Sequence, residues 1–363
     1  MKLSSILLIS TSLLLFLPSI LPSANSPAIS YKAKVAKNTG YDNKGLDFKI
    51  GQMLMVGFRG FRVGDSHPIA IDIRKHHLGG VVLYDRDIRG KKLQLNIESP
   101  KQLKALTRDL QGLSDTALFI AIDYEGGVIS RLKLEYGFPA TISHRQLGKT
   151  GDTALTYKEA GKMAKQLKSL GINLNLAPVV DLNTNPKNPV IGKLGRSFSE
   201  NPDIVSNHAL AYINASRENG IITTLKHFPG HGSSDTDSHL GFTDVTQKWS
   251  PAELEPFRQI VRKGKADAVM TAHVFNWRID PDYPATLSKK TISGLLRENL
   301  QYKGVVISDD LQMKAIADNY GLEEAVIKSI EAGIDIMIFS KNTDEEGKSL
   351  VKKVKSIILG AIA

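Results

Sequence analysis

Short apolar runs recur along the chain, and mixed polar and apolar segments separate them. The runs are rich in Val and Ile and are too brief for helices. Such runs are typical of strands that are buried on both faces of a parallel sheet. The sequence therefore predicts eight strands, at residues 52–58, 79–84, 117–123, 172–178, 221–227, 268–273, 304–308 and 334–340.

Several of the separating segments carry helix start signals. Residues 250–253, Ser-Pro-Ala-Glu, have the form of a capping box with proline at the first helical position. Asn201 precedes Pro202 in the same way, and residues 343–346 are predicted to open the last helix. The inward stripe of that helix would be Leu350, Val354, Ile357 and Ile358. Residues 158–170 and 322–332 are predicted to be helices of the same kind.

This alternation of strand and helix predicts an α/β fold, a single-domain (β/α)8 TIM-type barrel. A doubly wound open sheet is the alternative. It usually needs fewer repeats and a glycine-rich first turn, and Gly-Phe-Arg-Gly at 57–60 is a poor dinucleotide fingerprint. In a barrel, the active site is expected at the C-terminal ends of the strands.

The first thirty residues differ from the rest. Lys2 precedes an apolar stretch at 3–21, and small residues follow at 22–26. This pattern predicts a signal peptide over residues 1–30 and export to the periplasm or medium, or a membrane anchor if it is not cleaved. Residues 31–48 would be a polar lead-in, and residues 49–363 the barrel domain.

Composition narrows the classes of partner and chemistry. The net charge is +10, but the basic residues are scattered, without an arginine-rich run or interleaved aromatics. We therefore expect no nucleic-acid partner, and an electrostatic attraction to an anionic surface such as a cell wall. The chain has no cysteine, which excludes disulfides and thiolate chemistry. We expect a monomer.

Polar and ionisable residues stand at or just beyond the ends of most predicted strands, where a barrel would hold its active site. They are Asp123 and Glu125, Asp181, Lys226 and His227, His273, Asp309 and Asp310, and Ser340.

Two carboxylates suggest specific roles. Asp309 at the end of the seventh strand could be a nucleophile, a general base or a metal ligand, while Asp310 would cap the next helix. Asp237 and His239 are two residues apart, so in an extended segment they share a side. Asp237 could then orient His239 for proton transfer, as the carboxylate does in a catalytic triad.

Two arginines suggest a sugar-binding site. Asp123 could accept hydrogen bonds from sugar hydroxyls, and Arg131 could donate to them, although Arg131 could also pair with Glu125. Arg196 lies in a long segment without strand or helix signals, and such loops often bind ligands.

The histidines offer a different interpretation. His227, His231 and His239 with Asp235 could hold zinc, which would make loop 227–239 the centre of a metal-dependent barrel hydrolase. The spacing is not diagnostic, and His231 between two glycines is better interpreted as a turn histidine bonded to backbone. A non-catalytic wall-binding barrel is the third possibility.

Four motifs make the chain resemble glycoside hydrolase family 3, in its bacterial β-N-acetylglucosaminidase (β-N-acetylhexosaminidase) branch of single-domain form. The motifs are Asp-Tyr-Glu-Gly-Gly at 123–127 with Arg131, Asn-Pro-Val-Ile-Gly at 188–192 with Arg-Ser-Phe at 196–198, Lys-His-Phe-Pro-Gly-His-Gly at 226–232 with Asp-Ser-His at 237–239, and Ser-Asp-Asp-Leu-Gln-Met at 308–313.

The resemblance implies a retaining exo-enzyme without metal or cofactor. Asp309 would be the nucleophile and His239 the acid/base, polarised by Asp237. The terminal N-acetylglucosamine of a peptidoglycan fragment or chitin oligosaccharide would be bound by Asp123, Arg131, Arg196, Lys226 and His227.

Overall fold

The computed structural model describes residues 45–87 and 94–362, which belong to one compact unit, Lys44–Ala363. The predicted leader at 1–30 and most of the lead-in at 31–48 lie outside the described residues. The last residues of that lead-in begin the first helix, which starts at Leu46.

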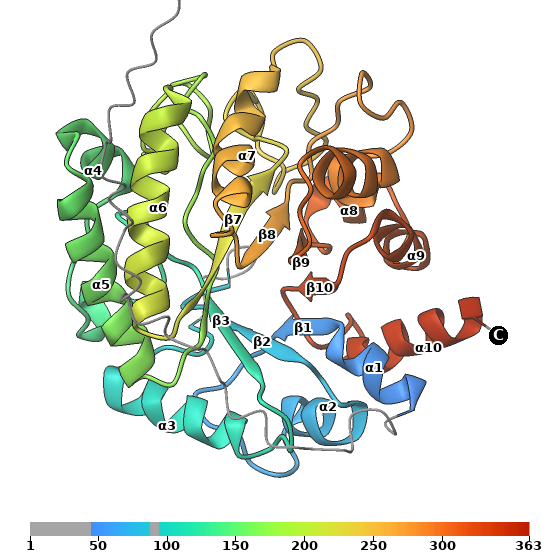
Figure 1. Ribbon diagram of the computed structural model, residues 1–363. Helices are drawn as coiled ribbons and strands as arrows, with labels where there is room; N and C mark the ends of the chain where they lie inside the picture. Colours follow the sequence, from blue (N-terminus) through green and yellow to red (C-terminus); the bar gives the residue numbers. More distant parts are fainter. Residues whose placement is uncertain (1–44, 88–93, 363) are drawn as a thin grey trace, which may run out of the picture. The chain divides into compact units, whose positions relative to one another are not determined.

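Eight parallel strands close into a barrel in the order β1-β10-β9-β8-β7-β6-β3-β2, which confirms the predicted fold (Figure 1). Each strand overlaps its predicted run, and β7 and β9 extend past it. The strands are β1 Leu54–Gly57, β2 Gly80–Leu83, β3 Phe119–Ile122, β6 Leu174–Asn175, β7 Ile222–Phe228, β8 Ala268–Thr271, β9 Val305–Asp310 and β10 Ile336–Phe339.

Alternate side chains of most strands enter two different hydrophobic clusters. On β3, Ala121 belongs to the cluster inside the barrel, together with Met55 and Met270. Its neighbours Ile120 and Ile122 belong to the larger cluster between barrel and helices. Both faces of these strands are therefore buried, which explains why their sequences are continuous apolar runs rather than alternating ones.

Helices surround the barrel (Figure 1). The α-helices are α1 Leu46–Gln52, α2 Pro68–His76, α3 Pro100–Gln111, α4 His144–Thr150, α5 Thr153–Ser169, α6 Pro202–Glu218, α7 Glu255–Arg262, α8 Lys314–Ala317, α9 Leu322–Ala332 and α10 Leu350–Ile362. Three short 3-10 helices are η1 Leu134–Tyr136, η2 Pro251–Leu254 and η3 Ala285–Leu287, and η4 Lys290–Asn299 is a π-helix. Asn201 caps α6 as predicted, because its side chain accepts from the amides of Asp203 and Ile204.

One predicted helix start is wrong, and one predicted capping box does not form. The helical segment begins at Pro251 after Ser250, as predicted, but Ser250 makes no side-chain capping hydrogen bond. The Glu253 carboxylate turns inward and accepts from the amide of Gly232 at 3.1 Å instead of closing the box. The last helix begins at Leu350 rather than at 343–346. Asp344 there accepts from the backbone amides of Glu346 and Lys348 and forms a turn, which competes with helix formation.

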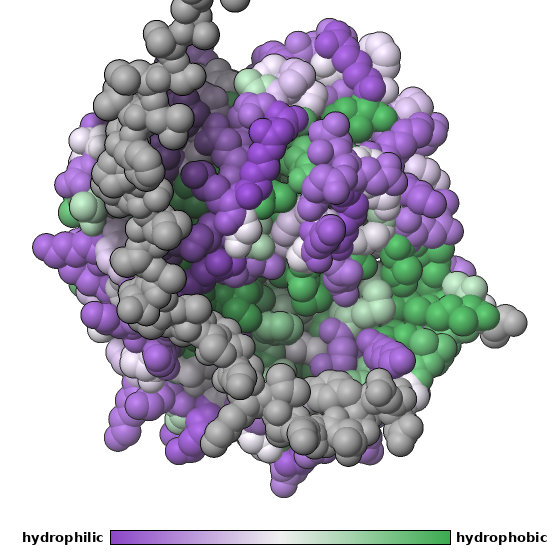
Figure 2. Space-filling view, viewed as in Figure 1, coloured by the Kyte–Doolittle hydropathy of each residue, from purple (hydrophilic) through white to green (hydrophobic). Residues whose placement is uncertain are grey.

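A small antiparallel hairpin, β4 Tyr124–Gly126 and β5 Ile129–Ser130, follows β3 and has no counterpart in the predicted elements. Within residues 45–87 and 94–362, no helix combines the length and apolar character that crossing a membrane requires. Figure 2 shows hydrophobic residues gathered at the end of α10, where Leu359 and Ile362 are exposed.

Candidate active site

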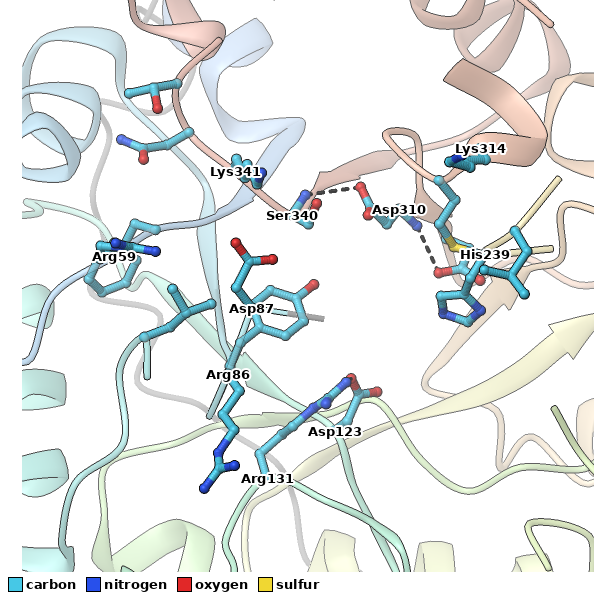
Figure 3. Close-up of a pocket in the computed structure, with 18 residues that line it drawn as sticks. Arg59, Arg86, Asp87, Asp123, Arg131, His239, Asp310, Lys314, Ser340 and Lys341 are labelled. Carbon is cyan, nitrogen blue, oxygen red and sulfur yellow. Dashed lines mark hydrogen bonds and ion pairs between the residues drawn. The ribbon is translucent and has the colours of Figure 1, made fainter. Parts of the chain in front are cut away.

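A cavity of about 630 Å³ opens at the C-terminal ends of the strands (Figure 3). Residues that follow β1, β2, β3, β7, β9 and β10 contribute to its wall, as expected for a barrel. Four of the predicted site residues line it: Asp123, Arg131, His239 and Asp309. The other predicted residues, Asp237, Arg196, Lys226 and His227, contact these four or support their neighbours.

Asp309 is fixed near the end of β9 and lines the cavity. Its Oδ1 accepts a hydrogen bond from the amide of Asp310 at 2.7 Å. Burial raises its pKa, but neighbouring histidines, among them His239, and the hydrogen bond from the Asp310 amide outweigh burial, so the pKa lies below the usual value for aspartate. Asp309 is therefore an ionised carboxylate, as a nucleophile must be.

Asp310 does not cap a helix, contrary to the prediction. Its Oδ1 accepts from the amides of Gln312 and Ser340, both at 2.9 Å. These bonds close the turn after β9 and join it to the end of β10, because the two strands are neighbours in the barrel. Asp310 thereby helps to hold the segment that carries Asp309.

His239 and Asp237 form the predicted pair. His239 Nδ1 lies 2.7 Å from Asp237 Oδ1, and the His239 amide donates to the same oxygen at 2.8 Å. The His239 side chain is 42% exposed and lines the cavity. Because Nδ1 donates to Asp237, Nε2 is the nitrogen available to a ligand.

Asp123 is a hydrogen-bond acceptor on a different side of the cavity from His239 (Figure 3). Lys226 Nζ donates to it at 2.8 Å and Arg131 Nη2 at 3.0 Å. Arg131 also reaches Asp85, at 3.4 Å. Burial raises the pKa of Asp123, but Lys226 and Arg131 hold it far below its usual range. Asp123 therefore presents a carboxylate beside a guanidinium, which suits paired hydroxyl groups.

Glu125 pairs with Arg196, not with Arg131. Two parallel hydrogen bonds of 2.9 and 2.7 Å join them, and both side chains are buried. Burial raises the pKa of Glu125, but Arg196 and Lys226 lower it to about 2. Arg131 does not pair with Glu125, because the β4–β5 hairpin brings Arg131 next to Asp123. The Arg131 amide donates there to the Asp123 carbonyl.

His227 is held as a neutral imidazole. Its Nδ1 lies 2.7 Å from Asp181 Oδ2, and its Nε2 lies 3.3 Å from Arg196 Nη2. Since arginine can only donate, Nε2 accepts and Nδ1 carries the proton. Burial, Arg196 and Lys226 place the His227 pKa well below its usual value. The peptide bond between Lys226 and His227 is cis.

The three histidines of loop 227–239 bond to separate partners. The two ring nitrogens of His231 contact the hydroxyls of Ser234 and Ser238. The prediction that the His231 side chain bonds to the backbone is therefore wrong. Asp235 binds Asn185 and Lys248. In the part of the chain that the structure describes, no three His, Asp or Glu side chains are grouped to hold a metal ion.

Sequence reasoning missed several residues of this site. Asp85 is buried and binds Arg131 and Lys133. It directly follows the predicted strand at 79–84, so the strand-end rule could have found it. Tyr84 lines the cavity, and Arg131 stacks over its ring at 5.4 Å. Asp181 was noted at a strand end but not placed in the site.

Comparison with known proteins agrees with this geometry. The chain is 35% identical over 327 residues to β-hexosaminidase A of Pseudoalteromonas piscicida, which covers 80% of this chain and 52% of that protein. A β-N-acetylglucosaminidase structure from Paenibacillus sp. str. FPU-7 superposes with a TM-score of 0.78 at 36% identity, over 88% of this chain and 58% of the other. A β-N-acetylhexosaminidase from Beutenbergia cavernae gives 0.77 at 28% identity, over 87% and 92%.

The chain thus spans little more than half the length of the first two of these relatives. The glycosyl hydrolase family 3 N-terminal domain itself matches residues 45–361, almost everything that the structure describes. Because this match extends over the whole closed barrel, the chain belongs to glycosyl hydrolase family 3.

Proposed function

We propose that the chain is a retaining exo-β-N-acetylglucosaminidase that removes terminal, non-reducing, β-linked N-acetylglucosamine. One observation carries this proposal: the Asp309 carboxylate and the His239 imidazole line the same cavity as Asp123 and Arg131. The names of the relatives, β-hexosaminidase and β-N-acetylglucosaminidase, support the same substrate class.

The Asp123 side of the cavity would bind the terminal sugar. Asp123 accepts from two adjacent hydroxyls, and Arg131 donates to them. On the side away from the cavity, Lys226 forms an ion pair with Asp123, and Arg196 forms one with Glu125. Figure 3 places Asp123 and Arg131 on a different side of the opening from His239, so a sugar between them would lie against all three.

Catalysis would proceed in two displacements. In the first, an Asp309 oxygen attacks the anomeric carbon, the bond from that carbon to the aglycone oxygen breaks, and His239 Nε2–H gives its proton to the departing oxygen. In the second, neutral His239 takes a proton from water. The resulting hydroxide forms a bond to the anomeric carbon, and the Asp309 carboxylate leaves.

Asp237 would support both steps. Its carboxylate holds Nδ1 of His239 and stabilises the imidazolium that exists before the first displacement and after the second. Burial raises the pKa of Asp237, but the hydrogen bonds that His239 donates to it outweigh burial, so the pKa lies below its usual value. The Asp237 carboxylate therefore stays negatively charged beside the His239 ring.

The aglycone would be part of a peptidoglycan fragment or a chitin oligosaccharide. Arg59, Lys314 and Lys341 line the cavity and outnumber the carboxylate of Asp87 there, and Figure 3 places Arg59 and Lys341 across the opening from His239. These cations favour an aglycone with carboxylates, which peptidoglycan has and chitin lacks. The leader pattern at residues 1–30 supports export to where such glycans occur.

The proposal is tested with aryl β-N-acetylglucosaminides. We expect turnover that survives a chelator, falls at least about 10³-fold in Asp309→Ala, and falls about 10²- to 10⁴-fold in His239→Ala. Full activity of the Asp309 variant would refute the mechanism. Loss of turnover with chelator and its recovery with zinc would favour the metal-dependent alternative.

The aglycone is tested by product analysis on a muropeptide-derived disaccharide and a chitin disaccharide. We expect higher kcat/KM on the muropeptide, and an Arg59→Ala/Lys341→Ala variant should lose this preference without losing chitin disaccharide hydrolysis. An equal or opposite preference in the natural protein would contradict the anionic aglycone.

A further inference from the structure

The loop that carries His239 enters the protein interior at a single point. Between Asp235 and Phe242, Ser238 is the only buried residue, with 2% of its surface exposed. The remaining residues of this segment are exposed or half-buried. Ser238 lies between Asp237 and His239 in the sequence, so whatever holds Ser238 also sets the position of the Asp237–His239 pair.

Ser238 is held from two directions. Its hydroxyl lies 3.1 Å from His231 Nε2, and its carbonyl accepts from the amide of Ala315 at 3.3 Å. Ala315 belongs to α8, the short helix that follows the β9 segment with Asp309. The backbone of the acid/base pair is therefore tied to the same segment as the nucleophile.

His231 is itself a rigid support. Its amide donates to Asp181 Oδ1 at 2.8 Å, and its carbonyl accepts from Asn188 Nδ2 at 2.7 Å. Its second ring nitrogen, Nδ1, lies 2.9 Å from the Ser234 hydroxyl. His231, Asp181, Asn188 and Ser234 are all buried. Backbone and ring are thus fixed, and Nε2 presents one directed bond to Ser238.

The imidazole suits this task because it stays neutral. Burial lowers the pKa of His231 below its usual value, although Asp181 opposes this effect. A neutral ring has one donor and one acceptor, and each meets one serine hydroxyl that can fill either role. Either tautomer therefore satisfies both contacts.

The turn around Ser238 is compact. The His239 amide donates to the Asp237 side chain, and the Leu240 amide donates to the Asp237 carbonyl at 2.9 Å. These bonds link residues 237–240 to one another, so the contacts of Ser238 bear on the position of the whole turn. A small change there would displace His239 Nε2 from the leaving oxygen, and such misplacement can cost about 10²-fold in rate.

We propose that His231 is a positioning residue: through Ser238 it sets where the His239 imidazole stands relative to Asp309. This inference rests on the proposed function, because it needs His239 to act as the acid. It assigns to the second histidine of the Lys-His-Phe-Pro-Gly-His-Gly segment a task distinct from metal binding and from sugar binding.

The test uses two substrates that differ only in the leaving group. Phenyl β-N-acetylglucosaminide needs a proton on its departing oxygen, whereas 2,4-dinitrophenyl β-N-acetylglucosaminide does not. For Ser238→Ala we expect kcat/KM on the phenyl substrate to fall about 10- to 100-fold and on the dinitrophenyl substrate less than about threefold. His239→Ala should show the same asymmetry with a larger amplitude.

Two further variants complete the test. His231→Phe should reproduce the Ser238→Ala pattern, and the double variant should lose little more than either single one, because the two residues act as a unit. If His231→Phe does not fold, Ser238→Ala alone decides. Ser329→Ala, the same change at a buried serine of α9, is the control and should leave both values unchanged.

The outcomes separate two failures. Equal losses on both substrates in Ser238→Ala, or no loss on either, would overturn the positioning role while leaving the proposed function intact. Wild-type protein that hydrolyses neither substrate, or an Asp309→Ala variant that hydrolyses both, would overturn the proposed function and the positioning role with it.

Discussion

Three charged side chains behind the cavity, Glu125, Lys226 and Arg196, are almost fully buried, and the fourth charge of their network, Asp123, lines the cavity and is 15% exposed. Lys226 lies between Asp123 and Glu125, and Glu125 also binds Arg196. Removing charges from water is costly, and a buried group that loses its partner keeps that cost without compensation. The four residues are therefore expected to be sensitive to single substitutions, in stability as well as in activity.

Glu125→Ala is expected to lower the free energy of unfolding by about 3–5 kcal/mol, because Arg196 would remain buried without its carboxylate. Urea unfolding followed by circular dichroism measures this. Glu135→Ala is the matched control, since Glu135 pairs with Arg86 at the surface and should change stability by less than about 1 kcal/mol. Similar losses in the two variants would contradict the buried network.

The buried carboxyl group of Glu253 is expected to make the free energy of unfolding depend on pH. Burial raises its pKa to about 7. Because the folded protein holds this proton more tightly than the unfolded chain, the stabilising effect is complete below about pH 4.5 and is lost as the pH rises through 7. The loss would be on the order of 3 kcal/mol.

The measurement compares urea unfolding of the natural protein and Glu253→Gln at pH 4.5 and pH 8. Gln keeps an acceptor for the Gly232 amide but cannot ionise. The variant should lose less stability than the natural protein over this interval. Parallel losses would show that Glu253 does not titrate there.

At the scale of elements, the site depends on two loops in direct contact. A Cβ atom on Gly232, in the loop after β7, would lie 1.7 Å from the carbonyl oxygen of Leu182, in the loop after β6. Asn188 then joins the same loops with hydrogen bonds to His231 and Gly232. These contacts tie the loop that carries His239 to the loop that carries Arg196.

Gly232→Ala should force these loops apart. We expect a loss of about 1–3 kcal/mol in stability and a larger relative loss of kcat/KM on the phenyl substrate. Gly294→Ala is the control, because a Cβ there meets no atom within 4 Å. An active Gly232 variant of normal stability would show that the loop contact is not needed.

The sequence predicts the barrel well, because strands that are buried on both faces consist of continuous apolar residues, which can be recognised in the sequence. Asp309 and Asp123 could also be identified, since they stand at strand ends. The pairing of Glu125 with Arg196 could not, because the residues are 71 positions apart and the β4–β5 hairpin decides which arginine is near. The start of the last helix was predicted too early, because the Asp344 side chain accepts from nearby backbone amides and forms a turn instead.

At the scale of the whole molecule, the net charge of +10 concerns partners rather than fold. We expect the full chain to co-sediment with anionic peptidoglycan at low ionic strength and to be released near 0.5 M salt, where the Debye length is only about 4 Å. Neutral chitin is the control and should show no comparable salt dependence. Salt-insensitive binding to both would contradict an electrostatic association.

The central claim is that Asp309 becomes covalently attached to the sugar while His239 stands opposite as the acid/base. The most direct measurement is peptide mass mapping after reaction with a 5-fluoro N-acetylglucosaminyl fluoride, in the natural protein and in His239→Ala. We predict a glycosyl adduct on the peptide that contains Asp309, and a longer-lived adduct in the His239 variant. An adduct on another residue, or none while turnover continues, would contradict the claim.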